Sequence, residues 1–210
     1  ASGTELRTFA SHGDAIKSVA FSPDGKTVAS GNGSAKDSQR KSNSVSLWDV
    51  ATGKPLAFWR ERHADAVLSL DFSPDGKLLA SGAADKTARV TEIASGKVVN
   101  LLEGHTHHVL GLSFRADGRV LATAGGDATV VIWDMILGER KRKIEGWGKE
   151  VTAVQFIGAT NQFVASCGDD LVRIADDAGG QVRSFAKLPD FMQSAASATT
   201  SNLIVAGGED

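Results

Sequence analysis

Residues 67–82 read VLSLDFSPDGKLLASG, and residues 16–31 repeat the same phrase as IKSVAFSPDGKTVASG. A third copy, VLGLSFRADGRVLATAG, occupies residues 109–125, and a fourth, less similar copy, VTAVQFIGATNQFVASCG, occupies residues 151–168. The aligned phenylalanines, which lie 51, 42 and 42 residues apart, are Phe21, Phe72, Phe114 and Phe156. A period near 42 residues indicates stacked copies of one supersecondary unit, which buries its apolar surface only against its neighbours.

Each copy is predicted to contain four short antiparallel strands. In the second copy, alternation over residues 67–72 is followed by a Ser-Pro-Asp-Gly turn, where proline presets φ and glycine accepts a positive φ. Further strands are expected over residues 78–82, 88–93 and 98–102, with turns between them and no helical periodicity. The expected fold class is therefore all-β.

Several markers at this spacing resemble the WD40-repeat β-propeller family over essentially the whole chain. They are Gly104-His105, the Ser-Pro-Asp-Gly turns, Trp48-Asp49 and Trp133-Asp134. The resemblance implies four-stranded blades, with strands called a to d from the centre outward, in a ring that most often has seven blades. The chain is then expected to be an open part of a larger ring, closed by the remainder of a propeller or by a second chain. A compact five-bladed ring is the alternative.

Alignment of the copies divides the chain into a single partial propeller with about five blades. The segments are an outer strand of a preceding blade at 1–9, blade 1 at 10–61, blade 2 at 62–103, blade 3 at 104–145, blade 4 at 146–186, and the inner half of blade 5 at 187–210.

Composition narrows the classes of function. The net charge is −2, which gives no electrostatic case for binding nucleic acid or an acidic membrane. A single cysteine, Cys167, excludes an intramolecular disulfide framework. No apolar run approaches the ~20 residues that span a bilayer. Neither a cofactor nor a metal is expected, because no phosphate-binding glycine loop or metal triad is present.

The chain also repeats the residue types of a hydrolase triad. Blade 3 offers His105, Thr123 and Asp127, and a nucleophile, a base and an orienting acid could be assigned to them. The same types recur at the same offsets in successive blades, whereas an enzyme needs one active site. In the WD40 family the matching residues form a buried hydrogen-bond chain that ends on a tryptophan. The residues predicted to belong to such structural networks are His12, Ser30 and Trp48 in blade 1, His63, Ser81 and Asp85 in blade 2, His105, Thr123, Asp127 and Trp133 in blade 3, and Ser166 with Asp169 (or Asp170) in blade 4.

Candidate partner-binding residues lie in the loops. An insertion between Gly31 and Val45 would project from the top rim of blade 1, either as a solvated loop or as a contact arm for an acidic partner. An exposed histidine pair in blade 3 and aromatic residues near the d–a loops are further candidates. The candidates are Lys36, Arg40, Lys41, Arg62, His107, His108, Trp147 and Phe191.

The predicted function is a non-enzymatic scaffold that binds protein or peptide partners through its top-face loops, without nucleic acid or membrane as partner. The alternative is a propeller segment of a larger multi-domain enzyme or sensor whose catalytic domain lies outside these residues. A third, weaker hypothesis is a small-molecule or metal site in the central channel.

Overall fold

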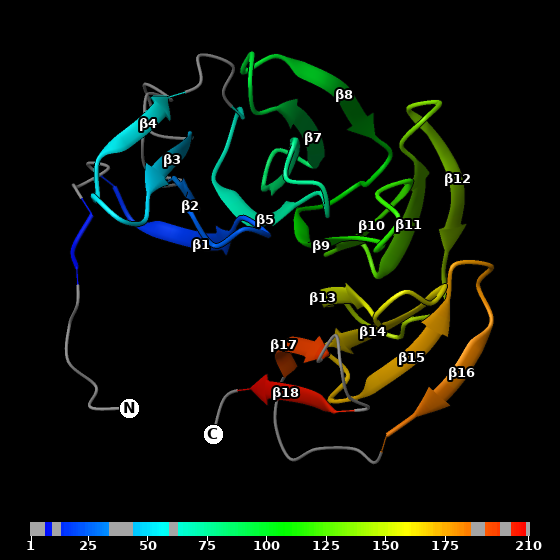
Figure 1. The fold of residues 1–210 in the computed structure, drawn as a ribbon. Coiled ribbons are helices and arrows are strands. Elements are labelled where there is room, and N and C mark those ends of the chain that lie inside the picture. Colours follow the sequence, from blue (N-terminus) through cyan, green and yellow to red (C-terminus); the bar gives the residue numbers. More distant parts are fainter. Residues whose placement is uncertain are drawn as a thin grey trace.

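The computed structural model describes residues 7–9, 14–33, 44–58, 63–185, 192–197 and 203–208. Within these ranges the chain forms strands and no helix, so the predicted all-β class is confirmed (Figure 1). Four sheets have four strands each in simple antiparallel order, and a fifth has two. No helix among the described residues has the length and apolarity to cross a membrane.

The sheets follow the repeats. Their strands are, in blade 1, β1 (Ile16–Phe21), β2 (Thr27–Asn32), β3 (Val45–Asp49) and β4 (Pro55–Phe58); in blade 2, β5 (Val67–Phe72), β6 (Leu78–Ala83), β7 (Thr87–Glu92) and β8 (Val98–Glu103); in blade 3, β9 (Val109–Phe114), β10 (Val120–Gly125), β11 (Thr129–Asp134) and β12 (Glu139–Ile144); in blade 4, β13 (Val151–Phe156), β14 (Gln162–Cys167), β15 (Val172–Asp176) and β16 (Gln181–Ser184); and in blade 5, β17 (Met192–Ser197) and β18 (Ile204–Gly208).

The turn between the first two strands shows why the repeated phrase folds as it does. In blade 2 the Ser73 hydroxyl donates to Asp75 Oδ1 at 2.6 Å, and the Gly76 amide donates to the Ser73 carbonyl at 2.8 Å. Gly76 has φ of 70°, a conformation that costs glycine little and other residues more. The turn therefore fixes the register of the hairpin formed by β5 and β6.

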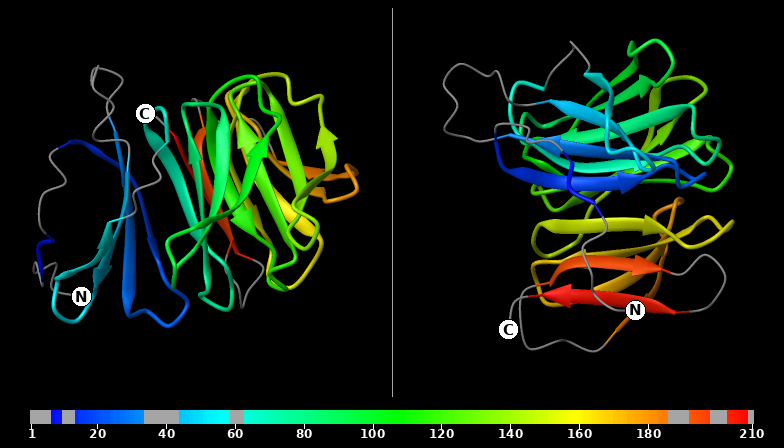
Figure 2. Two further views of the ribbon diagram at one scale, coloured as in Figure 1. Left: turned by 90° about the horizontal axis from the view of Figure 1, so that it is seen from above. Right: turned by 60° about the vertical axis from the view of Figure 1, so that its left-hand side comes forward.

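The five sheets stand side by side in an arc. The inner strands contact one another in chain order, β1 with β5, β5 with β9, β9 with β13, and β13 with β17. Figures 1 and 2 show the sheets as wedges around a common centre, with the ring open between blade 1 and blade 5. The sheets are not closed, so the structure is a partial propeller, as predicted.

Only residues 7–9 of the N-terminal segment predicted as an outer strand are described. Residues 7–9 lie outside any strand, and the rest of the strand predicted over residues 1–9 falls outside the described residues. The ring of Phe9 packs against that of Trp48, with centroids 5.9 Å apart. This contact holds the described part of the segment on blade 1.

Apolar clusters between blades form the core. The largest joins β10 and β11 of blade 3 to β13 and β14 of blade 4, around Ile132 and Phe163. Because each blade face is covered only by its neighbour, the faces at the ends of the arc remain open. Phe21 of blade 1 is 65% exposed, whereas Phe72 in the same position of blade 2 is 5% exposed.

The backbones of two neighbouring blades lie close together at Gly111 in β9. A Cβ atom at this position would lie 2.9 Å from Ala153 Cα and 3.0 Å from Val154 N, both backbone atoms of β13. We expect Gly111→Ala to lower the free energy of unfolding by about 1–3 kcal/mol, because the backbones must separate. Urea denaturation followed by tryptophan fluorescence measures this loss.

Ser69 occupies the same position in blade 2 and provides the control. In the part of the chain that the structure describes, its buried hydroxyl oxygen has no hydrogen-bond partner, so Ser69→Ala should leave stability unchanged or raise it. Equal losses in the two variants would contradict the argument from backbone contact.

Candidate functional site

The polar sets of the sequence gather at one rim of the arc. We call it the top rim: the loops that lead into the first strand of each blade, with the turns between its second and third strands. Among the described residues the top rim comprises 14–15, 33, 44, 63–66, 84–86, 104–108, 126–128, 145–150, 168–171 and 185.

Blade 3 contains the longest polar chain. Trp133 Nε1 donates to Thr123 Oγ1 at 2.9 Å, and Thr123 Oγ1 lies 2.8 Å from His105 Nε2. His105 Nδ1 lies 3.0 Å from Asp127 Oδ1. Because indole N–H donates only and an ionised carboxylate accepts only, the hydroxyl donates to Nε2 and Nδ1–H donates to Asp127. The backbone amide of Thr106 also donates to Asp127, at 2.8 Å.

Blade 2 repeats the arrangement without the tryptophan. His63 lies 2.9 Å from Asp85 through Nδ1 and 2.9 Å from Ser81 through Nε2. Burial by itself would raise the pKa of Asp85, but hydrogen bonds and charge from His63, together with the Thr87 hydroxyl, hold it well below its usual range. Thr91 stands where blade 3 has tryptophan, so the chain ends at Ser81.

Blade 1 shows the other end of the chain. Trp48 Nε1 donates to Ser30 Oγ at 2.6 Å, and both side chains are buried. His12, which the sequence groups with them, lies outside the described residues.

Blade 4 differs from the prediction for Ser166 because of its register. Val154 lies opposite Ala165, as Leu112 lies opposite Thr123 in blade 3. Ser166 is one residue further along, and successive side chains of a strand point to opposite faces. The Ser166 hydroxyl lies 2.8 Å from Thr152 Oγ1 instead. Ser166 is therefore not the counterpart of Thr123.

Asp169 also has a different partner from the one predicted. It lies in the turn that holds Asp127 in blade 3, but the histidine position is occupied by Trp147. Arg173 Nη1 donates to Asp169 Oδ1 at 3.0 Å, and burial, which would raise the Asp169 pKa, is outweighed by this guanidinium, which lowers it. The Arg173 guanidinium carbon also lies 5.8 Å from the centre of the Trp147 ring.

Trp147, predicted as a candidate partner-binding residue, is buried and does not present its ring to a partner. Its Nε1 donates to the Ile144 carbonyl at 3.2 Å, and its ring packs on Phe163 with centroids 6.3 Å apart. Ala165 and Ala175 stand at the hydroxyl and tryptophan positions of blade 3 and belong to the same apolar cluster. Blade 4 thus replaces the polar chain by one large and two small apolar residues.

The remaining loop candidates divide into two groups. His107 is exposed and His108 half-buried, with ring centroids 4.3 Å apart at the top rim of blade 3. The other candidates, Lys36, Arg40, Lys41, Arg62 and Phe191, lie outside the described residues. No group of three His, Cys, Asp or Glu side chains in the described ranges is placed to hold a metal ion.

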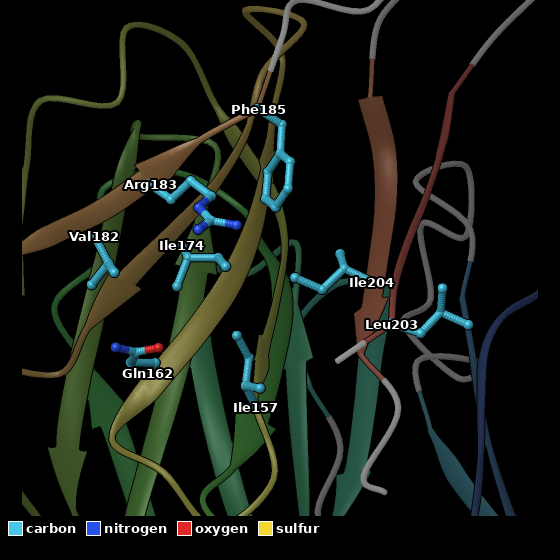
Figure 3. Close-up of a pocket in the computed structure, with 8 residues that line it drawn as sticks. All are labelled: Ile157, Gln162, Ile174, Val182, Arg183, Phe185, Leu203 and Ile204. Atoms are coloured by element: carbon cyan, nitrogen blue, oxygen red, sulfur yellow. The ribbon is translucent and has the colours of Figure 1, made fainter. Parts of the chain in front are cut away.

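The structure adds a groove that sequence reasoning missed, lined mostly by apolar side chains and also by Gln162 and Arg183. It has a volume of 480 Å³ and lies where β15 and β16 of blade 4 meet the start of β18 (Figure 3). Its apolar lining is Ile157, Ile174, Val182, Phe185, Leu203 and Ile204, and we call this set the blade 4 groove. The sequence carries only a weak signal for it, because Val182 is the single apolar residue of 181–184, the stretch that corresponds to the basic run 140–143 of blade 3.

Blades of four antiparallel strands, with buried polar chains at one rim, define a β-propeller repeat protein. The family profile of the WD domain, G-beta repeat, matches residues 3–49, 53–91 and 96–134. The chain belongs to the WD40-repeat family.

Curated relatives match smaller portions. Nuclear distribution protein PAC1 of Coccidioides posadasii is 30% identical over 99 residues, which are 47% of this chain and 21% of that protein. Poly(A)+ RNA export protein of Schizosaccharomyces pombe is 34% identical over 85 residues, 40% of this chain and 22% of that protein. Coronin-like protein of Saccharomyces cerevisiae is 45% identical over 56 residues, 27% of this chain and 8% of that protein. The chain thus matches about a fifth of the length of the first two.

Proposed function

We propose that the chain is a non-enzymatic scaffold that binds protein or peptide partners through its top-rim loops. The observation that carries this proposal is that the buried polar side chains of the blades are hydrogen-bonded to one another. Both ring nitrogens of His63 and of His105 have partners within their own blades, and both side chains are buried. A general base needs access to a substrate proton, so these sets support a structural role.

Family membership supports the same conclusion. WD40 repeats present variable loops on a constant framework, and the printed names of the relatives above are not those of enzymes. The balanced net charge of −2 favours a protein or peptide over nucleic acid as the partner.

We also propose that further propeller sheets, from the remainder of a ring or from a second chain, cover the leading face of blade 1. Ile16, Val19 and Phe21 of β1 are all exposed on this face. Their counterparts in blade 3, Val109, Leu112 and Phe114, are buried against blade 2. The leading face therefore has the apolar character of an interface without its neighbour.

Site-specific photo-crosslinking in cells tests the rim. A crosslinking residue at His107, on the top rim, should capture a defined polypeptide, identified by mass spectrometry in replicate. The same residue at Ile136, which is exposed in the turn at the opposite rim, is the matched control and should not capture it. Replacing residues 33–43 by a short Gly-Asp turn should weaken the capture without moving the thermal midpoint. Equal capture from both rims, or none from position 107, would refute the proposal.

A further inference from the structure

A further pocket, with a volume of 360 Å³, lies at the rim opposite the top rim, where the first strands of blades 2, 3 and 4 end in their turns. These strands, β5, β9 and β13, lie side by side (Figure 1). Each contributes one polar side chain to the pocket, namely Asp71, Ser113 and Gln155. The other described side chains in its lining are apolar, and they are Phe72, Pro74, Phe114, Ala116, Phe156 and Ala159. We call this site the bottom-rim pocket.

The charge of Asp71 exceeds what the contact between blades requires. Asp71 Oδ2 accepts the backbone N–H of Phe114 at 2.7 Å. At the next interface the neutral hydroxyl of Ser113 accepts the N–H of Phe156 at 3.1 Å. In blade 1 the same strand position holds Ala20, whose side chain has no acceptor. A neutral acceptor, or none, is therefore sufficient at this position of the fold.

The Asp71 carboxyl is enclosed without a counter-charge. In the described part of the chain it has no cationic partner, and the groups that favour its ionisation are the backbone amides of Phe114 and Phe72. Burial raises its pKa to about 7. An ionised carboxylate has about four lone-pair sites on its two oxygens, so these amides leave acceptor capacity unused. The described lining contains no basic side chain that could use it.

The composition of the pocket discriminates between kinds of cation. Ca²⁺ takes about six to eight oxygen ligands, and no group of three metal-binding side chains occurs in the ranges that the structure describes. A guanidinium presents its donors in a planar fork that matches several acceptors at once. An alkylammonium group has one compact charge, which suits a single carboxylate, and a methylene stem, which suits apolar walls.

We propose that the bottom-rim pocket binds a primary alkylammonium group, with its nitrogen on the Asp71 carboxylate and its methylene stem against the apolar lining. A lysine side chain of a partner protein and a free aliphatic amine both carry this group. The site is separate from the top rim and goes beyond the partner binding proposed there.

The probe is butylammonium chloride, titrated at pH 8 into the ¹⁵N-labelled chain and followed by two-dimensional NMR. We expect a saturable shift of the Phe114 amide signal, because this amide donates to Asp71. Butanol has the same stem without the charge, and sodium chloride matches the ionic strength. Neither should give a saturable shift, and a response to butanol equal to that of butylammonium would overturn the proposal.

Protein variants locate the charge that binds the probe. Asp71→Asn keeps an acceptor for the Phe114 amide and removes the negative charge, so it should preserve the fold and weaken binding by at least about tenfold. Its thermal midpoint, which should not fall below that of the parent at pH 8, separates lost binding from lost structure. Asp75→Asn is the matched control, because Asp75 lies in the adjoining turn outside the pocket lining and its loss should leave binding unchanged. Absence of saturable binding, or equal affinity of Asp71→Asn and the parent, would contradict the assignment.

A second titration distinguishes the two sources of the group. An acetylated and amidated Ala-Lys-Ala peptide is compared with its norleucine counterpart, which lacks the ammonium. Tighter binding of the lysine peptide than of butylammonium supports the site with a partner's lysine as its ligand, and the reverse order supports it with a free amine. Equal binding of the lysine and norleucine peptides would count against the site. These measurements involve no residue of the top rim, so their failure and failure of the crosslinking from position 107 are separate outcomes.

Discussion

Thr123→Val should lower the free energy of unfolding by about 2–4 kcal/mol, because one substitution leaves two buried polar atoms without partners. Thr123 Oγ1 accepts from Trp133 Nε1 and donates to His105 Nε2, and its side chain is fully buried in β10. Valine has nearly the same shape, so the loss reports the hydrogen bonds rather than a cavity.

Ser81→Ala in blade 2 is the graded control for this prediction. Ser81 faces His63 Nε2, but Thr91 replaces the tryptophan, so only one ring nitrogen loses its partner. We expect about half the loss of Thr123→Val, measured by urea denaturation of both variants under one condition. A larger loss at Ser81, or no loss at Thr123, would show that the polar chain of blade 3 does not stabilise the fold.

Much of the fold was predictable because the repeat is local. The Ser-Pro-Asp-Gly turns of blades 1 and 2 set the hairpin between their first two strands, and the strands follow at fixed offsets. The grouping of His63 with Ser81 and Asp85 was implied by the resemblance to the WD40 family, and the structure places these side chains within hydrogen-bonding distance.

Blade 4 shows where such reasoning fails. The letters ASCG around Ser166 resemble the ASG of blade 2, but strand pairing places Ala165, not Ser166, at the position of Ser81. A shift of one residue moves a side chain to the opposite face of the sheet. In blade 4, Trp147 stands where blades 2 and 3 have histidine. Trp147 packs in one cluster with the small residues Ala165 and Ala175, and only the strand register shows that these two alanines lie near it.

The contacts between inner strands were also missed, because they join residues 43 positions apart. Asp71 Oδ2 in β5 accepts the backbone N–H of Phe114 in β9 at 2.7 Å. Ser113, at the same position of the next blade, accepts the N–H of Phe156 at 3.1 Å. The acceptor between blades 3 and 4 is thus a neutral hydroxyl, whereas the acceptor between blades 2 and 3 is a carboxyl group. Burial raises the pKa of Asp71 to about 7, although hydrogen bonds from the Phe114 and Phe72 amides act in the opposite direction.

Asp71→Asn should therefore stabilise the chain at pH 8 and leave it unchanged near pH 3. Below the unfolded-state pKa of 3.8, both the folded and the unfolded chain hold the proton on Asp71, so its ionisation does not lower the free energy of unfolding. As pH rises from there to about 7, the unfolded chain releases the proton while the folded chain retains it, and stability falls.

Above about pH 7 the loss of folding free energy caused by the buried Asp71 carboxylate is constant, on the order of 2–4 kcal/mol. Asparagine keeps an oxygen that accepts the Phe114 amide and carries no charge, so it removes the cost. The measurement is the difference in unfolding free energy between variant and parent from pH 3 to pH 8, in which the contributions of unchanged residues cancel. Asp75→Asn is the control of opposite sign, because a hydrogen bond from the Ser73 hydroxyl lowers the pKa of Asp75. The loss it causes should appear as pH rises through the acidic range. A flat difference curve for Asp71→Asn would mean that its carboxylate is as well solvated in the folded chain as in the unfolded one.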